Sequence, residues 1–150
     1  MAGPGPASPG SPVPSSALAA ALDRVGDRWS LLIVEALLGG ARRFGELGEA
    51  VPGIAPNILA DRLRRLERAG IVRAMPYQRR PPRLDYTLTA DGRELAGAVR
   101  LLADWGARTG GAETEPLRHA VCGTDLEARW YCPTCERAVD GPDDEILRLV

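Results

Sequence analysis

The hydrophobic period of the chain changes at Gly70, from a helical spacing before this residue to a strand spacing after it. Up to residue 69, apolar side chains recur at intervals of three and four, which is typical of amphipathic helices. Residues 83–89 instead alternate between polar and apolar side chains, which is typical of a half-buried strand. The sequence therefore predicts three or four helices, a β-hairpin and a final helix, a mainly α architecture of the α+β class.

Residues that favour helix ends divide the first part of the chain. Ser16 is a suitable N-cap for a first helix that ends at Gly26, and Asp27 is a suitable N-cap for a second. The second helix ends at Gly39 and Gly40, and a short helix is expected over 44–50. The second helix has an inward stripe at helical spacing, made of Trp29, Leu32, Ile33, Ala36 and Leu37.

The next predicted helix, over residues 55–69, combines an apolar stripe with a basic surface. Pro56 suits the first helical turn, and Gly70 follows the last turn. The stripe expected to be buried is Leu59, Leu63 and Leu66, helped by Ile58. The opposite surface carries Asn57, Asp61, Arg64, Arg65 and Arg68, and Arg62 lies near the boundary between the two faces.

Two strands joined by a basic turn are predicted after Gly70. Residues 71–77 form the first strand, where Pro76 favours an edge position because proline cannot donate a ladder hydrogen bond. Residues 78–82, rich in Arg and Pro, form the turn before the strand at 83–89. Thr89 then caps a last long helix that ends near Gly110 and is expected to bury Leu95, Val99, Leu102 and Trp105.

Composition and charge divide the chain into a tail, one domain and an appendix. Residues 1–16 are mainly Gly, Pro, Ala and Ser, and we expect a disordered tail there. The expected domain is 17–110, where positions 17–109 hold 15 Arg against 11 acidic residues. Positions 110–150 hold 4 Arg against 9 acidic residues, which makes the appendix at 115–150 acidic towards its end. Arg is densest over 54–86, and its planar fork suits phosphate and guanine recognition.

Two short helices joined by a Pro-Gly turn, the second of them basic, form a helix-turn-helix candidate, and the hairpin after them is a candidate wing. In such a motif the second helix enters the major groove of double-stranded DNA. Asn57 and Asp61 are placed for base edges, and bases or phosphates are expected for Arg62, Arg64 and Arg65. An internal salt bridge with an acid of a neighbouring helix explains Arg62 almost equally well.

The remaining basic candidates lie around the helix-turn-helix. At the wing, contacts to a phosphate or to a narrow minor groove are expected for Arg79, Arg80 and Arg83. Arg43 either contacts the DNA backbone or pairs with Glu46 or Glu49. Arg68 is expected to be only solvated. The acidic end of the chain would repel DNA, so we expect it to lie away from the duplex.

Several segments, taken in order, resemble one known family. The matching segments are ALDRVGDRWSLLIVEALLGGARRFGEL, PGIAPNILADRLRRLERAGIV, PPRLDYTLTADGREL and a later Trp-Gly pair. Through these segments, the stretch from Leu22 to Gly106 resembles HxlR-type winged helix-turn-helix regulators of bacteria. The resemblance implies a homodimer whose interface uses the first and last helices of the core. It also implies a recognition helix at 55–69 and a wing around 78–83.

The sequence departs from the family pattern at two places. Family members usually have Ser before the recognition-helix proline, whereas this chain has Ala55, which cannot cap with its side chain. We expect a stability loss of about 1 kcal/mol from this change, without loss of binding. Many members also carry a Cys just before the first helix, and some sense oxidants or electrophiles through it. This chain has no Cys there, so that mechanism is not carried over.

All cysteines and the single histidine fall within a short segment of the appendix. The pattern is His119-x2-Cys122-x9-Cys132-x2-Cys135. One ring nitrogen and three thiolates satisfy a tetrahedral structural zinc ion and leave no open position for catalysis. The alternatives are a redox dithiol at Cys132 and Cys135, with Cys122 as a resolving partner, inert cysteines, or a weakly held contaminant metal.

The sequence favours a dimeric DNA-binding regulator, with a protein-interaction module as the alternative. We find no nucleophile–base pair and no phosphate-binding glycine loop, so we do not expect an enzyme. No apolar run is long enough to span a membrane and no secretory signal is visible, so a cytoplasmic protein is expected. The effector is open, either a small molecule or a redox signal.

Overall fold

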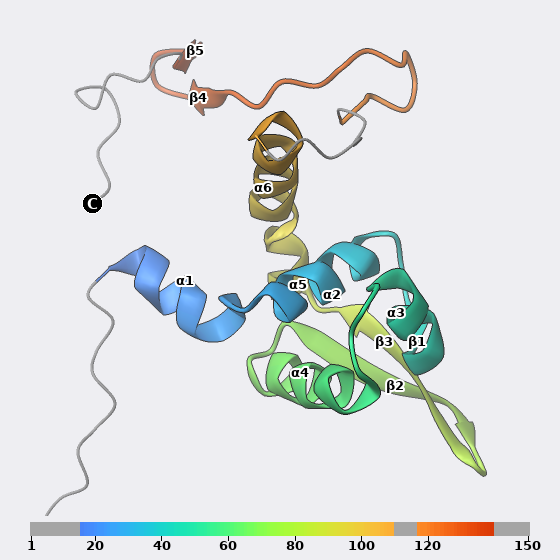
Figure 1. The fold of residues 1–150 in the computed structure, drawn as a ribbon. Coiled ribbons are helices and arrows are strands. Elements are labelled where there is room, and N and C mark those ends of the chain that lie inside the picture. The colour runs from blue at the N-terminus through green and yellow to red at the C-terminus, as the bar shows by residue number, and fades with distance from the viewer. Residues whose placement is uncertain (1–15, 110–116, 140–150) are drawn as a thin grey trace, which may run out of the picture. The chain divides into compact units, whose positions relative to one another are not determined.

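The computed structural model describes residues 16–109 and 117–139, with the elements arranged as in Figure 1. The chain divides into two compact units, of which the first ends at Val99 and the second begins at Arg100. The predicted tail before Ser16 and the acidic segment 140–150 lie outside the described residues, so both stay predictions. Within the described part, no helix is long and apolar enough to cross a membrane.

Side-chain caps define where the first two helices begin. Helix α1 spans Ala17–Val25, and the Ser16 side chain accepts a hydrogen bond from a backbone N–H in its first turn. Helix α2 spans Arg28–Leu38, and Asp27 caps it in the same way. An N-cap oxygen pairs with one of the N–H groups that a helix start leaves unpaired. Both predicted helices are therefore confirmed.

The helix-turn-helix consists of two further helices. Helix α3 spans Phe44–Ala50, and helix α4 spans Pro56–Arg68. After α4, Gly70 adopts a φ of 72°, which favours glycine. This conformation lets the Ile71 N–H bond to the Leu66 carbonyl at 2.9 Å, so the chain reverses directly into the first wing strand.

A three-stranded antiparallel sheet follows, in the order β1-β3-β2. Strand β2 spans Val72–Arg79 and β3 spans Pro82–Leu88, while β1 is the short pair Arg42–Arg43. β2 lies at the edge of the sheet, as Pro76 predicts. The predicted turn over 78–82 is too long, because the strand ladder continues past an irregularity and leaves only residues 80 and 81 between the strands.

The last helix of the predicted domain is divided in two. Helix α5 spans Ala90–Glu94, with Thr89 as its N-cap, and α6 spans Ala96–Thr109. At the break, the backbone N–H of Leu95 bonds to the carbonyl three residues earlier, at 3.3 Å. The expectation that Leu102 and Trp105 are buried is wrong for the single chain, since they are 53% and 60% exposed.

The hydrophobic core lies in the first unit, where the helices pack on the sheet. Helix α2 contacts both α4 and β3, and α4 contacts β2. At the far end of the sheet, α5 approaches so closely that a Cβ on Gly92 would lie 2.1 Å from the Ile71 carbonyl oxygen. The core side chains come from all of these elements: Val25, Ile33, Val34, Leu37, Leu47, Val51, Ile54, Leu59, Leu63, Leu66, Ile71, Val72, Leu88 and Val99.

The described part of the appendix forms two small hairpins. In the first, Leu117 and Leu126 are joined by a backbone hydrogen bond, and Arg118 pairs with Asp125 in an isolated bridge. In the second, β4 (Trp130–Cys132) pairs antiparallel with β5 (Arg137–Val139). None of the residues described between 117 and 139 is buried.

Candidate nucleic-acid interface

Helix α4 presents a polar face because its apolar face is fixed in the core. Leu59, Leu63 and Leu66 are each at most 1% exposed, which sets the rotation of the helix about its axis. The first turn has Pro56 and no side-chain cap from Ala55, as the sequence predicts. The N–H groups at the start of α4 therefore have no side-chain acceptor at the N-cap position.

Three polar side chains on α4 are exposed and make no hydrogen bond or ion pair within the described part of the chain. Among the residues that the structure describes, no side-chain hydrogen bond or ion pair involves Asn57, Arg64 or Arg68. Asn57 lies in the first turn, Arg64 two turns further on, and Arg68 at the last residue. Free donors on an exposed helix face can contact an external ligand without first breaking an internal bond.

Arg62 and Asp61 are engaged within the protein. The Arg62 Nε atom donates to Asp27 Oδ1 at 3.0 Å, and its Nη1 atom donates to Asp61 Oδ2 at 2.6 Å. The structure thus supports the salt-bridge alternative for Arg62, between α4 and the N-cap of α2. Asp61 keeps an exposed side chain, but one of its oxygens already accepts from Arg62.

The Asp27 carboxylate joins a helix cap to the recognition-helix candidate. Burial tends to raise the pKa of Asp27, but hydrogen bonds from the Ser30 side chain and backbone, together with Arg62, outweigh it and lower the pKa below its usual value. Arg65 adds a second link to the same region, because its Nη2 atom donates to the Asp23 carbonyl at 2.6 Å. These contacts fix the position of α4 against α1 and α2.

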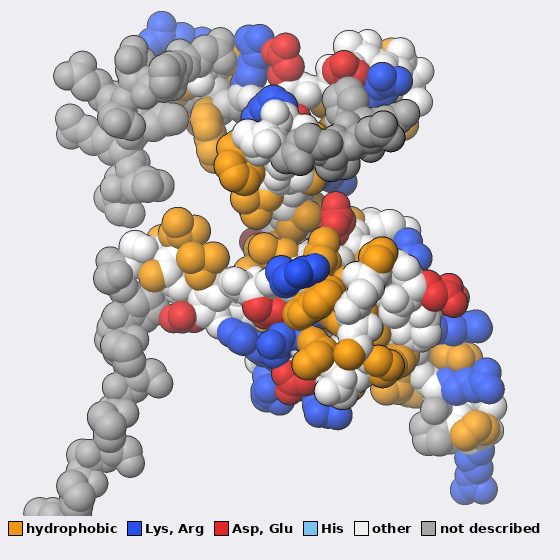
Figure 2. All heavy atoms as spheres, viewed as in Figure 1, with side chains coloured by type: hydrophobic (Ala, Val, Ile, Leu, Met, Phe, Trp, Pro, Cys, Tyr) orange, Lys and Arg blue, Asp and Glu red, His pale blue; other side chains and the backbone are white. Residues whose placement is uncertain are grey.

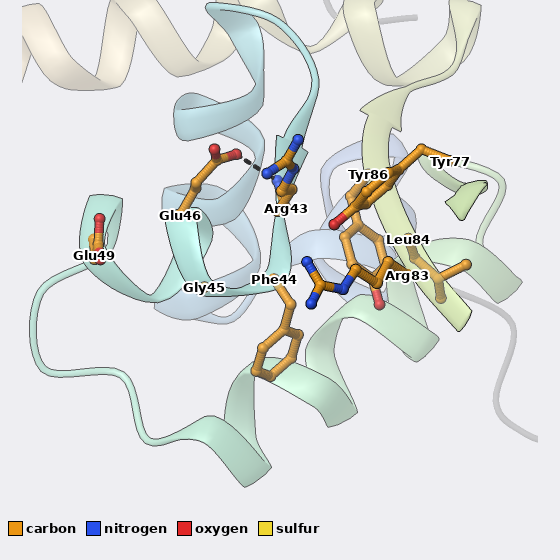
Figure 3. A pocket seen from close by; sticks show the side chains of 9 residues that line it. All are labelled: Arg43, Phe44, Gly45, Glu46, Glu49, Tyr77, Arg83, Leu84 and Tyr86. Carbon is orange, nitrogen blue, oxygen red and sulfur yellow. Dashed lines mark hydrogen bonds between the residues drawn. The ribbon is translucent and has the colours of Figure 1, made fainter. Parts of the chain in front are cut away.

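The wing extends from the sheet as a narrow basic ribbon. Figure 2 shows blue side chains along this ribbon and at its end, and others on the same side near α4. Arg80 lies exposed in the tip, and the Arg79 side chain lies outside the described part of the structure. Arg83 is exposed but, as Figure 3 shows, its guanidinium points from β3 towards the space beside Phe44.

Arg43 has partners that the sequence did not predict. Its guanidinium lies over the Tyr77 ring, 4.6 Å from the centroid, and its Nε atom is 3.7 Å from Asp85 Oδ1. Glu46 accepts instead from the Arg43 backbone N–H at 2.7 Å (Figure 3). The expected side-chain pairing with Glu46 or Glu49 is therefore not what holds Arg43, which links β1 to the wing.

A hollow of about 580 Å³ lies between α3 and the wing. Figure 3 shows side chains of both elements around it, among them Phe44, Tyr77 and Tyr86. Arg43 and Arg83 contribute positive charge to its wall, whereas Glu46 and Glu49 contribute negative charge from α3. The hollow therefore has walls of mixed charge and an exposed position, which is typical of a junction between two surface elements.

The four predicted metal ligands form two pairs, each at a hairpin turn. His119 Nδ1 lies 3.2 Å from Cys122 Sγ. Hydrogen bonds from the side chain and backbone of Thr124, and then from His119, lower the pKa of Cys122 to about 7. A backbone hydrogen bond from Cys135 lowers the pKa of Cys132. Within 16–109 and 117–139, no three His, Cys, Asp or Glu side chains meet around a single point.

An exposed basic helix after a turn, with a basic two-stranded wing, defines the winged helix-turn-helix class. The comparisons agree, since the family model described as HxlR-like helix-turn-helix matches residues 24–114. The chain belongs to the HxlR-like helix-turn-helix family. The family resemblance seen in the sequence is thereby confirmed, whereas the matched segment ends before the cysteines.

Curated relatives carry regulator names. An uncharacterized HTH-type transcriptional regulator of Mycobacterium tuberculosis is 40% identical over 119 residues, which cover 77% of this chain and 74% of the relative. YtcD of Bacillus subtilis, with the same description, is 35% identical over 88 residues, which cover 59% of this chain and 70% of YtcD.

Solved structures share the fold at similar identity. The redox regulator HypR in its reduced form is 32% identical with a TM-score of 0.60, covering 64% of this chain and 95% of HypR. The reduced form of the transcriptional regulator YodB from B. subtilis is 33% identical with a TM-score of 0.53, covering 61% of this chain and 90% of YodB.

Proposed function

We propose that the chain is a transcriptional regulator that binds double-stranded DNA as a homodimer, with α4 in the major groove and the wing on the backbone or the minor groove. The observation behind the proposal is the exposed polar face of α4, where Asn57, Arg64 and Arg68 make no internal hydrogen bond or ion pair among the described residues, opposite a fully buried leucine stripe. The names of the relatives, which are HTH-type transcriptional regulators, support the same function.

The free side chains of α4 are assigned to direct contacts with DNA. Asn57, in the first turn, suits the donor–acceptor edge of adenine, and Arg64 suits a guanine edge or a phosphate. The side chains of Arg62 and Asp61 are not both free for DNA, because they already bond to each other. We assign Arg62 to positioning α4 through Asp27, and Asp61 to a base-edge contact through its remaining acceptor capacity.

The wing and the strand before α3 are assigned to the DNA backbone. Arg80 at the tip is exposed and adds positive charge beyond the sheet. Arg43 is held by Tyr77 and Asp85, so its guanidinium is ordered before DNA arrives. Arg79 and Arg83 complete the basic set, with Arg83 reaching a phosphate only after turning away from Phe44 (Figure 3).

Exposed apolar side chains support the homodimer. On α1, Leu18 and Leu22 are 67% and 50% exposed, and on α6, Leu102 and Trp105 are 53% and 60% exposed. Figure 2 shows hydrophobic side chains on the surface of both helices. Each helix thus has apolar area that a second copy would cover. A two-fold dimer would place two α4 helices on half-sites about one DNA turn apart.

If the effector is a redox signal, we propose that it acts outside the HxlR-like segment. HypR is named a redox regulator, but every cysteine of this chain lies between positions 122 and 135, beyond the segment that matches the family. A redox signal would therefore reach the DNA-binding unit from the appendix. A small-molecule effector is the alternative, with the hollow between α3 and the wing as its candidate site.

The experiment is a binding assay on duplexes selected from a random-sequence pool by the full chain. Arg64→Ala should weaken binding to the selected duplex about tenfold or more, because a good base contact contributes about 1–3 kcal/mol. Arg137→Ala is the matched control, since Arg137 is also an exposed arginine but lies on β5, outside the HxlR-like segment, and it should leave affinity within twofold. Equal affinities for wild type and Arg64→Ala would contradict the assignment of α4.

A further inference from the structure

We propose that His119, Cys122, Cys132 and Cys135 together bind one structural Zn²⁺ ion, which closes the hairpins 117–126 and 130–139 onto each other. The inference concerns the appendix and does not depend on DNA binding. Each hairpin supplies two of the four ligands from its turn. The resulting set of one imidazole nitrogen and three thiolates is one of the standard structural zinc sites.

The first hairpin brings two ligands into the relation that one metal ion requires. Its turn is closed by hydrogen bonds from the Gly123 N–H to the His119 carbonyl and from the His119 N–H to the Thr124 carbonyl, both 2.8 Å long. His119 Nδ1 then lies 3.2 Å from Cys122 Sγ. In a tetrahedral site, ordinary Zn–N and Zn–S bond lengths place these two atoms about 3.6 Å apart. A small opening of the pair is enough to admit the ion.

The tightness of this first turn depends on glycine. Gly123 adopts a φ of 71°, and it follows Cys122 directly. The Cys122 thiol donates to the Thr124 hydroxyl oxygen, with 3.3 Å between Sγ and Oγ1. Outside the turn, the Arg118 Nε atom lies 3.1 Å from Asp125 Oδ1 and holds the two arms together. The turn therefore holds the Cys122 sulfur beside the His119 ring.

The second hairpin has an equivalent turn. Cys132 ends β4 opposite Arg137, and Cys135 lies in the turn between them. Backbone N–H groups of Cys135 and Thr134 donate to the Cys132 sulfur and hold it at the turn. Glu136 adopts a φ of 52°, which lets the chain leave the turn immediately after the second ligand. This turn is thus shaped to present two sulfurs on one side.

The connection between the hairpins allows both turns to meet. Only residues 127–129 join the first hairpin, which ends at Leu126, to the second, which begins at Trp130. A bend within this short connection would bring the two turns to the same end of the segment. In the described residues the ligands meet only as pairs, so the metal would have to bring the two hairpins together.

The lack of a core explains why the appendix would need a metal. Val121, Trp130 and Tyr131 are 87%, 64% and 63% exposed, so apolar burial contributes little to holding the hairpins. Segments of this size usually rely on disulfides or a metal ion. Three cysteines cannot all be paired within one chain, whereas all three are used when one histidine joins them around zinc.

The test is the metal content of the full chain, purified without chelators and measured by elemental mass spectrometry, together with the visible spectrum after Co²⁺ replacement. The wild type should hold about one zinc per chain, and its Co²⁺ form should show intense tetrahedral bands with a thiolate charge-transfer band. Cys132→Ser and His119→Ala should lower the metal content at least tenfold. His119→Cys should retain it, because four thiolates also bind zinc tetrahedrally.

The control is Thr134→Ser, a change within the same turn that removes no ligand, and it should keep the full zinc content. A wild type that takes up no zinc when incubated with a stoichiometric amount would overturn the proposal. So would full zinc content in Cys132→Ser, or a Cys132–Cys135 disulfide in freshly purified, metal-free protein. Circular dichroism of each variant separates metal loss from unfolding, because the winged helix supplies most of the helical signal.

Discussion

The first unit, up to Val99, surrounds a continuous apolar core, whereas the described segment from Leu117 to Val139 buries no residue at all. The first unit has helices with three or four apolar residues on one face, and these faces meet across the sheet. The second segment has one hairpin closed by an isolated bridge and one with three-residue strands, both too short to bury a face. The difference indicates that burial stabilises the first unit and that the hairpins need another source of stability.

Leu63→Ala should give the largest effect on the winged helix unit. Leu63 is 1% exposed at the centre of the core, so truncation leaves a cavity and should lower the free energy of unfolding by about 3 kcal/mol. Chemical denaturation followed by circular dichroism measures this change. A loss below about 1 kcal/mol would mean that the core is packed less tightly than the structure shows.

Asp27→Ala should give the second largest effect. The substitution removes the N-cap of α2 and leaves Arg62 without its partner, so we expect a loss of about 2 kcal/mol. Asp23→Ala is the matched control, because only the backbone carbonyl of Asp23 is used, by Arg65. The same denaturation assay should show little change for this control.

The contribution of Asp27 should also depend on pH. Its pKa in the folded protein is lowered from 3.8, so its stabilisation is fully present above that value and is lost as the pH falls through the lowered pKa. The stability difference between wild type and Asp27→Asn should shrink as the pH is lowered from 7 to 3. A constant difference over this range would contradict the lowered pKa of Asp27.

Ala55→Ser should produce a smaller, stabilising effect. Ala55 has the extended backbone of an N-cap, with φ of −73° and ψ of 143°, but no side-chain acceptor. A serine oxygen could accept from an N–H in the first turn of α4 and should raise the free energy of unfolding by about 1 kcal/mol. Thermal melting of the two proteins measures the difference, and an unchanged or lower melting temperature would argue against a free cap position.

Val121→Ser should give the smallest effect and tests the other side of the comparison. Val121 is 87% exposed, so its side chain contributes almost no burial, and the unfolding free energy of the winged helix unit should change by less than about 0.5 kcal/mol. A change above 1 kcal/mol in the same denaturation assay would show that the appendix packs on something that the described residues do not reveal.

Most helix boundaries could be predicted because caps and glycines are local signals. Ser16, Asp27 and Thr89 each begin a helix, and Gly70 lies at the end of α4, as the sequence indicates. The leucine stripe of α4 likewise sets which side of the helix is exposed. The exposure of Asn57 and Arg64 therefore follows from the spacing of apolar residues alone, whereas the internal bonds of Asp61 and Arg65 on the same face do not.

Features that depend on distant pairing could not be predicted. Strand β1 has only two residues, too few for any alternation, and it exists because it pairs with β3. The same pairing gives Arg43 its contacts with Tyr77 and Asp85 in place of a nearby glutamate. The helical spacing also predicts that Trp105 lies on the apolar face of its helix. Spacing alone, however, cannot distinguish a core within one chain from a surface that a second copy would cover.

The most direct test of the central claim is the salt dependence of duplex binding by the full chain. A protein that neutralises several phosphates with arginines should lose affinity steeply as salt rises, with a log–log slope of about −3 or steeper. Fluorescence anisotropy of a labelled duplex at increasing salt concentration provides this slope. A DNA-binding regulator should show such a steep fall, whereas weak binding that does not change with salt would contradict a DNA-binding role and favour a protein-interaction module.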